Sequence, residues 1–175
     1  MNTLDRRCQL KKLKICSFFG HRDCRLTGKQ KNNLYELIEN LIISFNVKEF
    51  LFGEHAFDKI SFYICLDLKM KYPEINLIYV RAKNENPSKD FIDKILELYD
   101  DTYFPKSAHN SGKYCYIKRN FDMIEKSDYC IFYYLERTHS ISREFGSNKI
   151  IKTKSGTKIA LDYAKKKSKE IIIIN

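Results

Sequence analysis

The hydrophobic positions of this chain fall into two alternating kinds of segment. Short continuous apolar runs of strand length alternate with segments whose apolar residues recur every three or four positions, as on one face of a helix. The runs predict strands over residues 14–20, 49–53, 75–82, 129–135 and 170–174. Strands that alternate with helical segments are typical of a parallel sheet with crossover helices.

The helical segments each carry one apolar stripe, which predicts a face packed on the sheet. Two further helices are predicted: residues 88–99, which Ser88 caps, and residues 116–127. The stripes are Leu34, Leu37 or Ile38, Leu41 and Phe45 in the first helix, Phe57, Ile60, Ile64 and Leu68 in the second, and Ile117, Phe121 and Ile124 in the helix over 116–127.

Two long segments, 100–115 and 137–154, fit no regular element. Loops of this length in a compact domain are usually functional. The fold prediction is one domain over 14–175, preceded by a basic extension over 1–13. It is a Rossmann-like, doubly wound and mainly parallel five-stranded sheet of order 3-2-1-4-5, with helices on both faces.

Composition narrows the class of protein without naming a function. The chain has 175 residues, of which 43% are hydrophobic, enough to bury one core. It contains no apolar run of about 18 residues and its start lacks the apolar middle of a signal peptide, so a soluble, cytoplasmic protein with no membrane partner is expected. The six cysteines have no zinc-binding spacing, which predicts reduced thiols and no metal site.

The formal net charge of +10 is concentrated near the two ends of the chain. Residues 1–14 carry five Lys or Arg and one acid, and residues 137–169 carry ten and two acids. Such an excess indicates either a polyanionic partner or ligand, or a lysine-rich composition with solvated charges. The second reading is favoured because no basic helix is interleaved with aromatic residues.

The predicted topology selects two loops as candidate chemistry. Ligands of open parallel sheets bind at the carboxyl ends of the strands, where the strand order reverses. Here the reversal lies between the first and fourth predicted strands. Gly20, His21 and Arg22 follow the first strand, and the segment Ser155, Gly156, Thr157 precedes the last helix. The two loops are therefore expected to face each other across one crevice.

A phosphate suits this crevice. The amino end of a helix offers backbone N–H groups, and Gly156 would let a phosphate approach them closely. Arg22 would offer a bidentate guanidinium from across the crevice. Ser-Gly-Thr also begins many helices that bind no ligand, so the prediction depends on the convergence of both loops.

Residues after the second predicted strand are weaker candidates. Gly53 ends that strand, and Asp58 lies near the start of the following helix. Asp58 would either contact a ligand or complement the helix dipole. His55 is interpreted as a loop residue rather than a catalytic one.

The helix before the fourth predicted strand contributes one further pair. Arg119 and Asn120 are expected at the edge of this helix, from where they could reach the crevice. The alternative for Arg119 is an ion pair with Asp122 or Glu125 on the same helix.

The motifs GHRD, FLFGEHAFD, LKMKYPEINLIYVRA, YIKRNFDMIEKSDYCIFYY and SGTKIALDYAKKKSKEIIIIN occur in that order over residues 14–175. With them the chain resembles the YpsA-like branch of the SLOG superfamily. These are Rossmann-like domains that bind nucleotides or their derivatives, related to the DNA-processing protein DprA and to the LOG phosphoribohydrolases. The resemblance implies a ligand site of Gly20, His21, Arg22, Gly53, Asp58, Arg119, Asn120, Ser155, Gly156 and Thr157.

The sequence departs from the hydrolase pattern at one loop. LOG enzymes carry a PGGxGTxxE-type loop whose glutamate assists cleavage of the N-glycosidic bond. Here the loop reads TKSGTKIA, and no acid follows Thr157 within four residues. This departure favours binding over hydrolysis.

These observations leave three candidate functions. The first is binding or sensing of a nucleotide, NAD or an ADP-ribose-like ligand, with no required cofactor. The second is hydrolysis of a nucleotide N-glycosidic bond, with Glu54 or Asp58 as the catalytic carboxylate. The third is single-stranded DNA binding through the basic ends, with Tyr133, Tyr134 or Tyr103 as stacking surfaces. The first is favoured, nucleic acid is not, and a homo-oligomer is possible.

Overall fold

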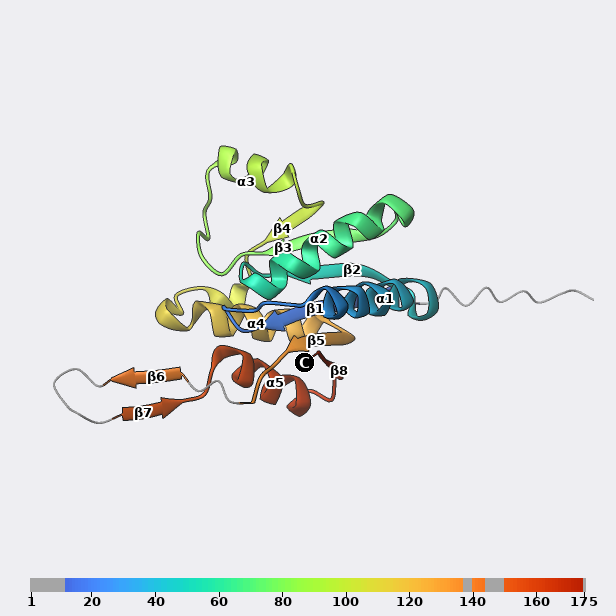
Figure 1. Cartoon of the computed structure of the whole chain (residues 1–175). Coiled ribbons are helices and arrows are strands. Elements are labelled where there is room, and N and C mark those ends of the chain that lie inside the picture. The colour runs from blue at the N-terminus through green and yellow to red at the C-terminus, as the bar shows by residue number, and fades with distance from the viewer. Residues whose placement is uncertain (1–11, 137–139, 144–149, 175) are drawn as a thin grey trace, which may run out of the picture.

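The computed structural model describes residues 12–136, 140–143 and 150–174. Its main sheet contains six parallel strands in the order β4-β3-β2-β1-β5-β8 (Figure 1). The strands are β1 (Lys14–Gly20), β2 (Val47–Phe52), β3 (Asn76–Val80), β4 (Asp101–Tyr103), β5 (Tyr129–Tyr133) and β8 (Glu170–Ile174). The strand order reverses between β1 and β5, which makes that pair the topological switch point.

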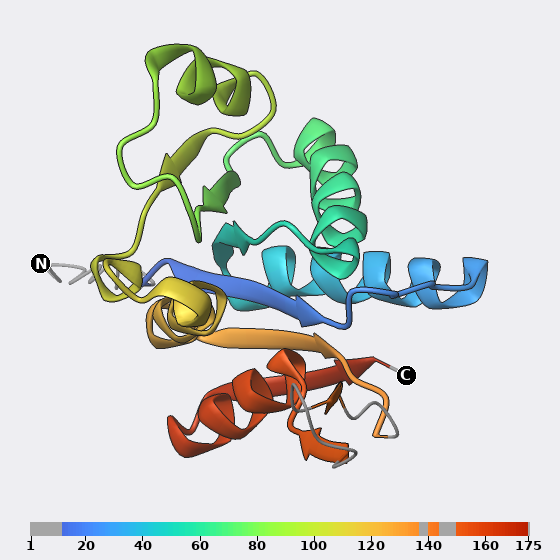
Figure 2. The same ribbon diagram turned by 90° about the vertical axis from the view of Figure 1, so that its left-hand side faces the viewer.

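Helices cover both faces of the sheet (Figure 2). Apolar residues of α1 and α2 share one core cluster with β1, β2 and β5, whereas those of α4 and α5 share the other. The third helix, α3, lies beside β4 at one end of the sheet and buries none of its residues. The helices are α1 (Gly28–Phe45), α2 (Ala56–Lys71), α3 (Lys89–Leu96), α4 (Cys115–Lys126) and α5 (Gly156–Lys166).

Alternate residues of β1 supply these two cores because successive side chains of a strand point to opposite faces. Phe18 stacks on Phe52 with ring centroids 5.2 Å apart. Its neighbour Phe19 stacks on Phe132 at 4.9 Å on the other face. Burying each of these side chains stabilises the fold by about 1.5–3 kcal/mol. The central strand therefore anchors both layers.

Local sequence signals define the ends of the helices. Thr27 and Gln30 form a reciprocal capping box at the start of α1, with Thr27 N donating to Gln30 Oε1 at 2.9 Å. Ser88 caps α3 as predicted, accepting a hydrogen bond from Phe91 N at 3.3 Å. The first helix ends at Asn46, whose φ of 57° is left-handed.

The doubly wound fold is confirmed, and β1 and β8 have the predicted bounds. The prediction of five strands is wrong, because β4 adds a sixth at the edge, inside a segment interpreted as irregular. Strand β4 is too short and too polar to show an alternation of apolar and polar residues in the sequence. Its neighbours stabilise it, with Leu77 N donating to Asp100 Oδ2 at 2.7 Å and Thr102 Oγ1 donating to Tyr79 O at 2.8 Å.

The same two long segments contain further short elements. Residues Lys106–Ala108 and Gly112–Tyr114 form single 3₁₀ turns. Strands β6 (Ser140–Arg143) and β7 (Ile150–Thr153) pair antiparallel as a separate two-stranded sheet. Residues 1–11 of the predicted extension, and 137–139 and 144–149 of the basic loop, lie outside the described residues.

Two predicted helix faces are partly wrong. In α4 the buried positions are Cys115, Arg119, Met123 and Ile124, whereas Ile117 and Phe121 are half-buried. Phe121 instead stacks on Tyr163 of α5, with centroids 3.8 Å apart. In α2, Phe57 and Leu68 are buried as predicted, Ile60 and Ile64 are half-buried and pack against the core, and Phe62 and Cys65 are buried in addition. Phe45 at the end of α1 is 43% exposed.

No helix in the described part of the chain is both long and apolar enough to cross a bilayer.

Candidate functional site

A cleft of ≈ 580 Å³ opens at the carboxyl ends of β1 and β5, the predicted switch point. Gly20 and Tyr133 are register partners there, which brings the loops after the two strands together. Nine of the ten predicted ligand residues line this cleft. They are Gly20, His21, Arg22, Asp58, Arg119, Asn120, Ser155, Gly156 and Thr157.

The amino end of α5 forms one wall. Ser155 is the N-cap, and its Oγ accepts a hydrogen bond from Lys158 N at 3.1 Å. Ile159 N donates to Ser155 O at 3.0 Å. The N–H groups of Gly156 and Thr157 have no acceptor within the described residues, as expected for the first turn of a helix. A β-carbon at Gly156 would meet no heavy atom within 4 Å, so its backbone faces open space.

The loop after β1 also lines the cleft. Gly20 is required by packing, because a β-carbon there would lie 2.4 Å from Cβ of Phe57. Strand β1 therefore approaches α2 closely at the point where the chain enters the cleft lining. His21 Nε2 accepts a hydrogen bond from Leu135 N at 3.2 Å, which links the loops after β1 and β5. Arg22 is exposed and lines the cleft.

Arg119 is the most deeply buried cation of the site, with 2% of its surface exposed. Its Nε donates to Asn120 Oδ1 at 2.9 Å, and its Nη1 donates to Val80 O at 3.1 Å. The expectation that Arg119 lies at the helix edge is wrong, because α4 turns it toward the sheet. The alternative ion pair within α4 is also wrong, since Asp122 pairs with Lys126 at 2.9 Å.

Asp58 is buried and organises the loop between β2 and α2. Its Oδ1 accepts a hydrogen bond from Gly53 N at 2.7 Å, and its Oδ2 accepts one from His55 N at 3.1 Å. Burial raises the pKa of the Asp58 carboxyl, while the charge of Arg119 opposes that rise. Both oxygens of this carboxylate are therefore engaged in positioning the backbone.

Two sequence candidates do not line the cleft. Gly53 lies behind it, against the guanidinium of Arg119. Glu54 accepts a hydrogen bond from Tyr79 Oη at 3.2 Å. Burial, with the nearby charge of Glu54, raises the pKa of Tyr79 to about 12. Glu54 is thus directed toward β3 rather than toward the switch point.

The cleft also includes residues that sequence reasoning did not select. The aromatic pair His55 and Tyr116 forms part of its lining, with ring centroids 5.6 Å apart. Lys113 adds a cation from the segment before α4. The length of 100–115 was a usable signal for Lys113, because that segment was expected to be functional. The interpretation of His55 as a loop residue misses its place in the lining, since no local pattern shows that it meets Tyr116.

The electrostatic balance of the cleft favours an anion. Arg22, Lys113 and Arg119 bring three positive charges, and Asp23 and Asp58 bring two negative ones. The carboxylate of Asp58 is already satisfied by two backbone N–H groups. The exposed side chains of Arg22 and Lys113 and the N–H groups at the start of α5 therefore offer donors to an anion. Within the described residues, no group of three His, Cys, Asp or Glu is arranged to hold a metal ion.

Fold and site together define a Rossmann-like, doubly wound α/β protein with an anion-favouring cleft at its topological switch point. No family model matches the chain, and no curated protein matches it.

Proposed function

We propose that this protein binds a nucleotide or a nucleotide-derived ligand in the switch-point cleft, with a phosphate at the amino end of α5. The observation that carries the proposal is that Arg22 and Gly156 line the same cleft, although 134 positions separate them in the sequence. A guanidinium and free helix N–H groups in one cleft form a recurrent arrangement for phosphate.

The phosphate end of the site has three contributions. The N–H groups of Gly156 and Thr157 are available as donors, and the helix dipole favours an anion there by about 0.3–1 kcal/mol. Arg22 supplies a flexible counter-charge from the loop after β1. The absence of a side chain at position 156 leaves space for a phosphate oxygen near the backbone.

The cleft also offers aromatic surface for a base. The rings of His55 and Tyr116 line it side by side. Aromatic side chains stack on bases with little dependence on base identity. The volume of ≈ 580 Å³ lies within the range of small-molecule sites. AMP, NAD, ADP-ribose and cyclic nucleotides are the ligand classes to compare.

Membership of the YpsA-like branch of the SLOG superfamily belongs to the same proposal. It is supported by the motif residues 20–22, 58, 119–120 and 155–157, which line one cleft. The loop TKSGTKIA still lacks the glutamate of the LOG hydrolases. The proposal is therefore a binding or sensing role.

The geometry of the carboxylates favours binding over hydrolysis. A general base needs an oxygen that can accept the proton of the attacking water near the reacting carbon. Both oxygens of Asp58 already accept backbone hydrogen bonds, and Glu54 lies outside the cleft. Stacking of single-stranded DNA has weaker support, because Tyr133 is buried, Tyr134 is half-buried beside His21, and Tyr103 donates to Asp122 at 2.8 Å.

A ligand screen by thermal shift tests the proposal directly. Wild-type protein is expected to show saturable stabilisation by at least one of the four ligand classes, rising with concentration as mass action requires. Arg22→Ala and Gly156→Asp should each abolish that stabilisation and leave the unliganded melting temperature nearly unchanged. Arg25→Ala is the matched control, because Arg25 is exposed on the same loop but does not line the cleft.

Two results would contradict the proposal. Equal ligand stabilisation in wild type, Arg22→Ala and Gly156→Asp would remove the phosphate site. Release of free base from the bound nucleotide, detected by chromatography and lost in Asp58→Asn, would replace binding by hydrolysis.

A further inference from the structure

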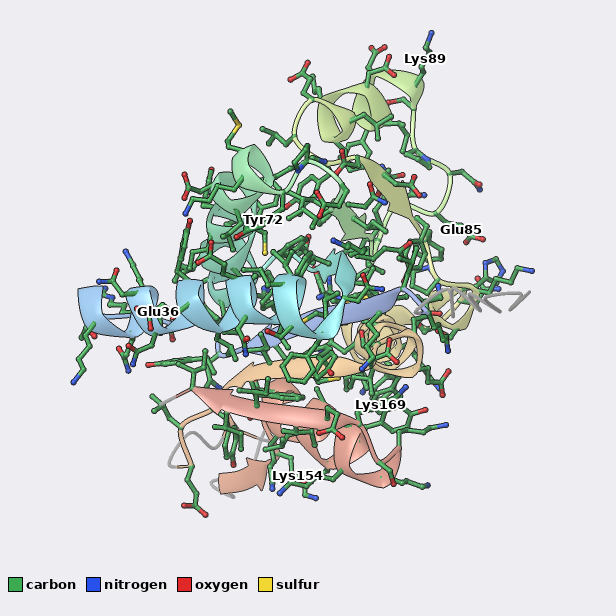
Figure 3. The ribbon with its side chains drawn as sticks, turned by 90° about the vertical axis from the view of Figure 1, so that its right-hand side faces the viewer. Glu36, Tyr72, Glu85, Lys89, Lys154 and Lys169 are labelled. Atoms are coloured by element: carbon green, nitrogen blue, oxygen red, sulfur yellow. The ribbon has the colours of Figure 1, made fainter. Side chains whose placement is uncertain are left out.

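A second cavity of ≈ 630 Å³ lies at the carboxyl ends of β3 and β4, at the other end of the sheet. Figure 3 shows the separation: Glu85, which lines this cavity, lies toward α3 and β4, and Lys154, next to Ser155, lies toward α5 and β8. The side chains used below are Arg81, Glu85, Phe104, Lys106 and His109. None of them lines the switch-point cleft.

Arg81 is the main feature of this cavity because it is a buried cation with no carboxylate partner in the described part of the chain. Only 8% of its surface is exposed. Its Nη1 donates to Asn84 O at 2.6 Å, but its Nε has no hydrogen-bond acceptor among the described residues. No carboxylate of the described chain lies within ion-pair distance of it, and burial lowers the pKa of its guanidinium.

Arg119 is also a buried arginine, but its guanidinium has hydrogen-bond acceptors within this fold. Its Nε and Nη1 both have acceptors, and the charge of Asp58 interacts with it. An arginine that is buried without such compensation costs free energy, since it has lost water and gained no counter-charge. An anion in the adjacent cavity would supply the missing partner of Arg81.

The remaining lining groups define what kind of anion fits. The carboxylate of Glu85 contacts Nδ1 of His109, so the cavity's own acid is already engaged. Lys106 adds an exposed positive charge. The guanidinium of Arg81 lies 6.0 Å from the ring centroid of Phe104, which gives the cavity an apolar wall beside its cation. The positive charge of Arg81 and an apolar surface therefore lie next to each other in this cavity.

We propose that this cavity is a second, separate binding site for a small organic anion, a carboxylate or phosphate monoester attached to an aromatic or other apolar group. The anionic head pairs with Arg81 and Lys106, and the apolar part packs against Phe104. The position agrees with the general preference of ligands for the carboxyl ends of parallel strands. The inference does not depend on the ligand proposed for the switch-point cleft.

The test uses the full chain and four probes: phenyl phosphate, benzoate, inorganic phosphate and phenol. Binding is followed by calorimetry and by ¹H–¹⁵N correlation spectra. Phenyl phosphate or benzoate is expected to bind, with amide shifts at Thr102 and Phe104, and at least tenfold more tightly than phenol. The anion that binds better identifies the head group, and weaker binding of inorganic phosphate measures the contribution of the apolar wall.

Variants separate this site from the first. Arg81→Met, which keeps the length of the side chain without its charge, should weaken the better aromatic anion at least tenfold, and Lys106→Met several-fold. Arg22→Ala should leave this affinity unchanged, because Arg22 lines only the other cleft. Lys106 is exposed, so its variant reports on binding even where Arg81→Met fails to fold.

Three outcomes would overturn the proposal. The first is equal affinity of phenol and both anions. The second is that Lys106→Met leaves the anion affinity unchanged, while Arg81→Met either leaves it unchanged or does not fold. The third is a set of amide shifts confined to residues 155–157, which would assign the probe to the switch-point cleft alone.

Discussion

Arg119 packs its guanidinium directly against the backbone of Gly53, so closely that a β-carbon at position 53 would lie 2.3 Å from Nη1. The missing side chain lets the end of β2 accept a buried cation from α4. The same glycine donates its N–H to Asp58 at 2.7 Å. One residue thus positions both buried charges of the site.

Gly53→Ala should therefore displace the Arg119 guanidinium and break its hydrogen bond to Val80 O. Overpacking of this kind costs about 1–3 kcal/mol of unfolding free energy, measurable by urea denaturation. In an Arg119→Ala background the same glycine substitution should cost less, because the clashing atoms are gone. A double-mutant cycle with no coupling between the two positions would refute this account of Gly53.

Gly156→Ala should remove ligand binding without destabilising the protein. The new methyl group meets no protein atom and would occupy the space assigned to the phosphate. Gly28→Ala is a matched control, since Gly28 is also the first residue of a helix, and a β-carbon there also meets nothing within 4 Å. Thermal melts should be similar for both variants, and nucleotide stabilisation should be lost only in Gly156→Ala. Loss in both, or in neither, would contradict the prediction.

Ser155→Ala should affect stability and binding together. Loss of its side-chain hydrogen bond to Lys158 N removes the cap of α5, which typically costs about 1 kcal/mol. Ser88→Ala removes the equivalent cap of α3. Chemical denaturation should show a decrease of similar order in each variant, but the nucleotide affinity measured by calorimetry should decrease only for Ser155→Ala. An unchanged affinity there would exclude the hydroxyl from the phosphate site.

His55 should make the protein less stable as the pH falls. Burial lowers the pKa of His55 in the folded state, and the charge of Asp58 only partly offsets this effect. As the pH decreases through the usual histidine value of about 6.5, the unfolded chain takes up a proton that the folded protein resists, so the free energy of unfolding decreases. The stability contribution is present above that pH and is lost below it.

Urea midpoints at pH 7.5, 6.5 and 5.5 measure this dependence. His55→Gln should show a smaller decrease from pH 7.5 to 5.5 than wild type, because glutamine does not titrate. Lys113→Gln serves as the control, because it replaces another residue of the cleft lining by glutamine and leaves His55 in place. Parallel pH profiles for wild type and His55→Gln would show that His55 is not held neutral by its surroundings.

The hydrophobic pattern was sufficient to predict the layers of the fold. Strand β1 was predicted from Lys14 to Gly20 and β8 from Glu170 to Ile174, because buried parallel strands are continuous apolar runs. Topology then predicted that Arg22 and Gly156 would lie in one crevice, since Arg22 follows the first strand and Gly156 comes at the end of the long loop after the fourth predicted strand. The cleft lining confirms that juxtaposition.

Side-chain periodicity was a poor guide where a polar residue is buried. Arg119 was placed at a helix edge because the apolar stripe of α4 was counted from Ile117, Phe121 and Ile124. In the structure Arg119 is 2% exposed, since Gly53 leaves room for it and Val80 O accepts its hydrogen bond. These partners lie far away in the sequence, so no local pattern contains them.

The sequence by itself determined the alternation of strands and helices, the capped start of α5 and the loops that meet at the switch point. These features depend on short-range spacing and on the handedness of crossover connections, which residue order encodes directly. Only the tertiary structure decided that β4 joins the sheet, that His55 meets Tyr116, and that Arg81 is buried with no counter-charge from the residues that the structure describes. Each of these depends on contacts between distant segments, whose free energies appear only when the chain is packed.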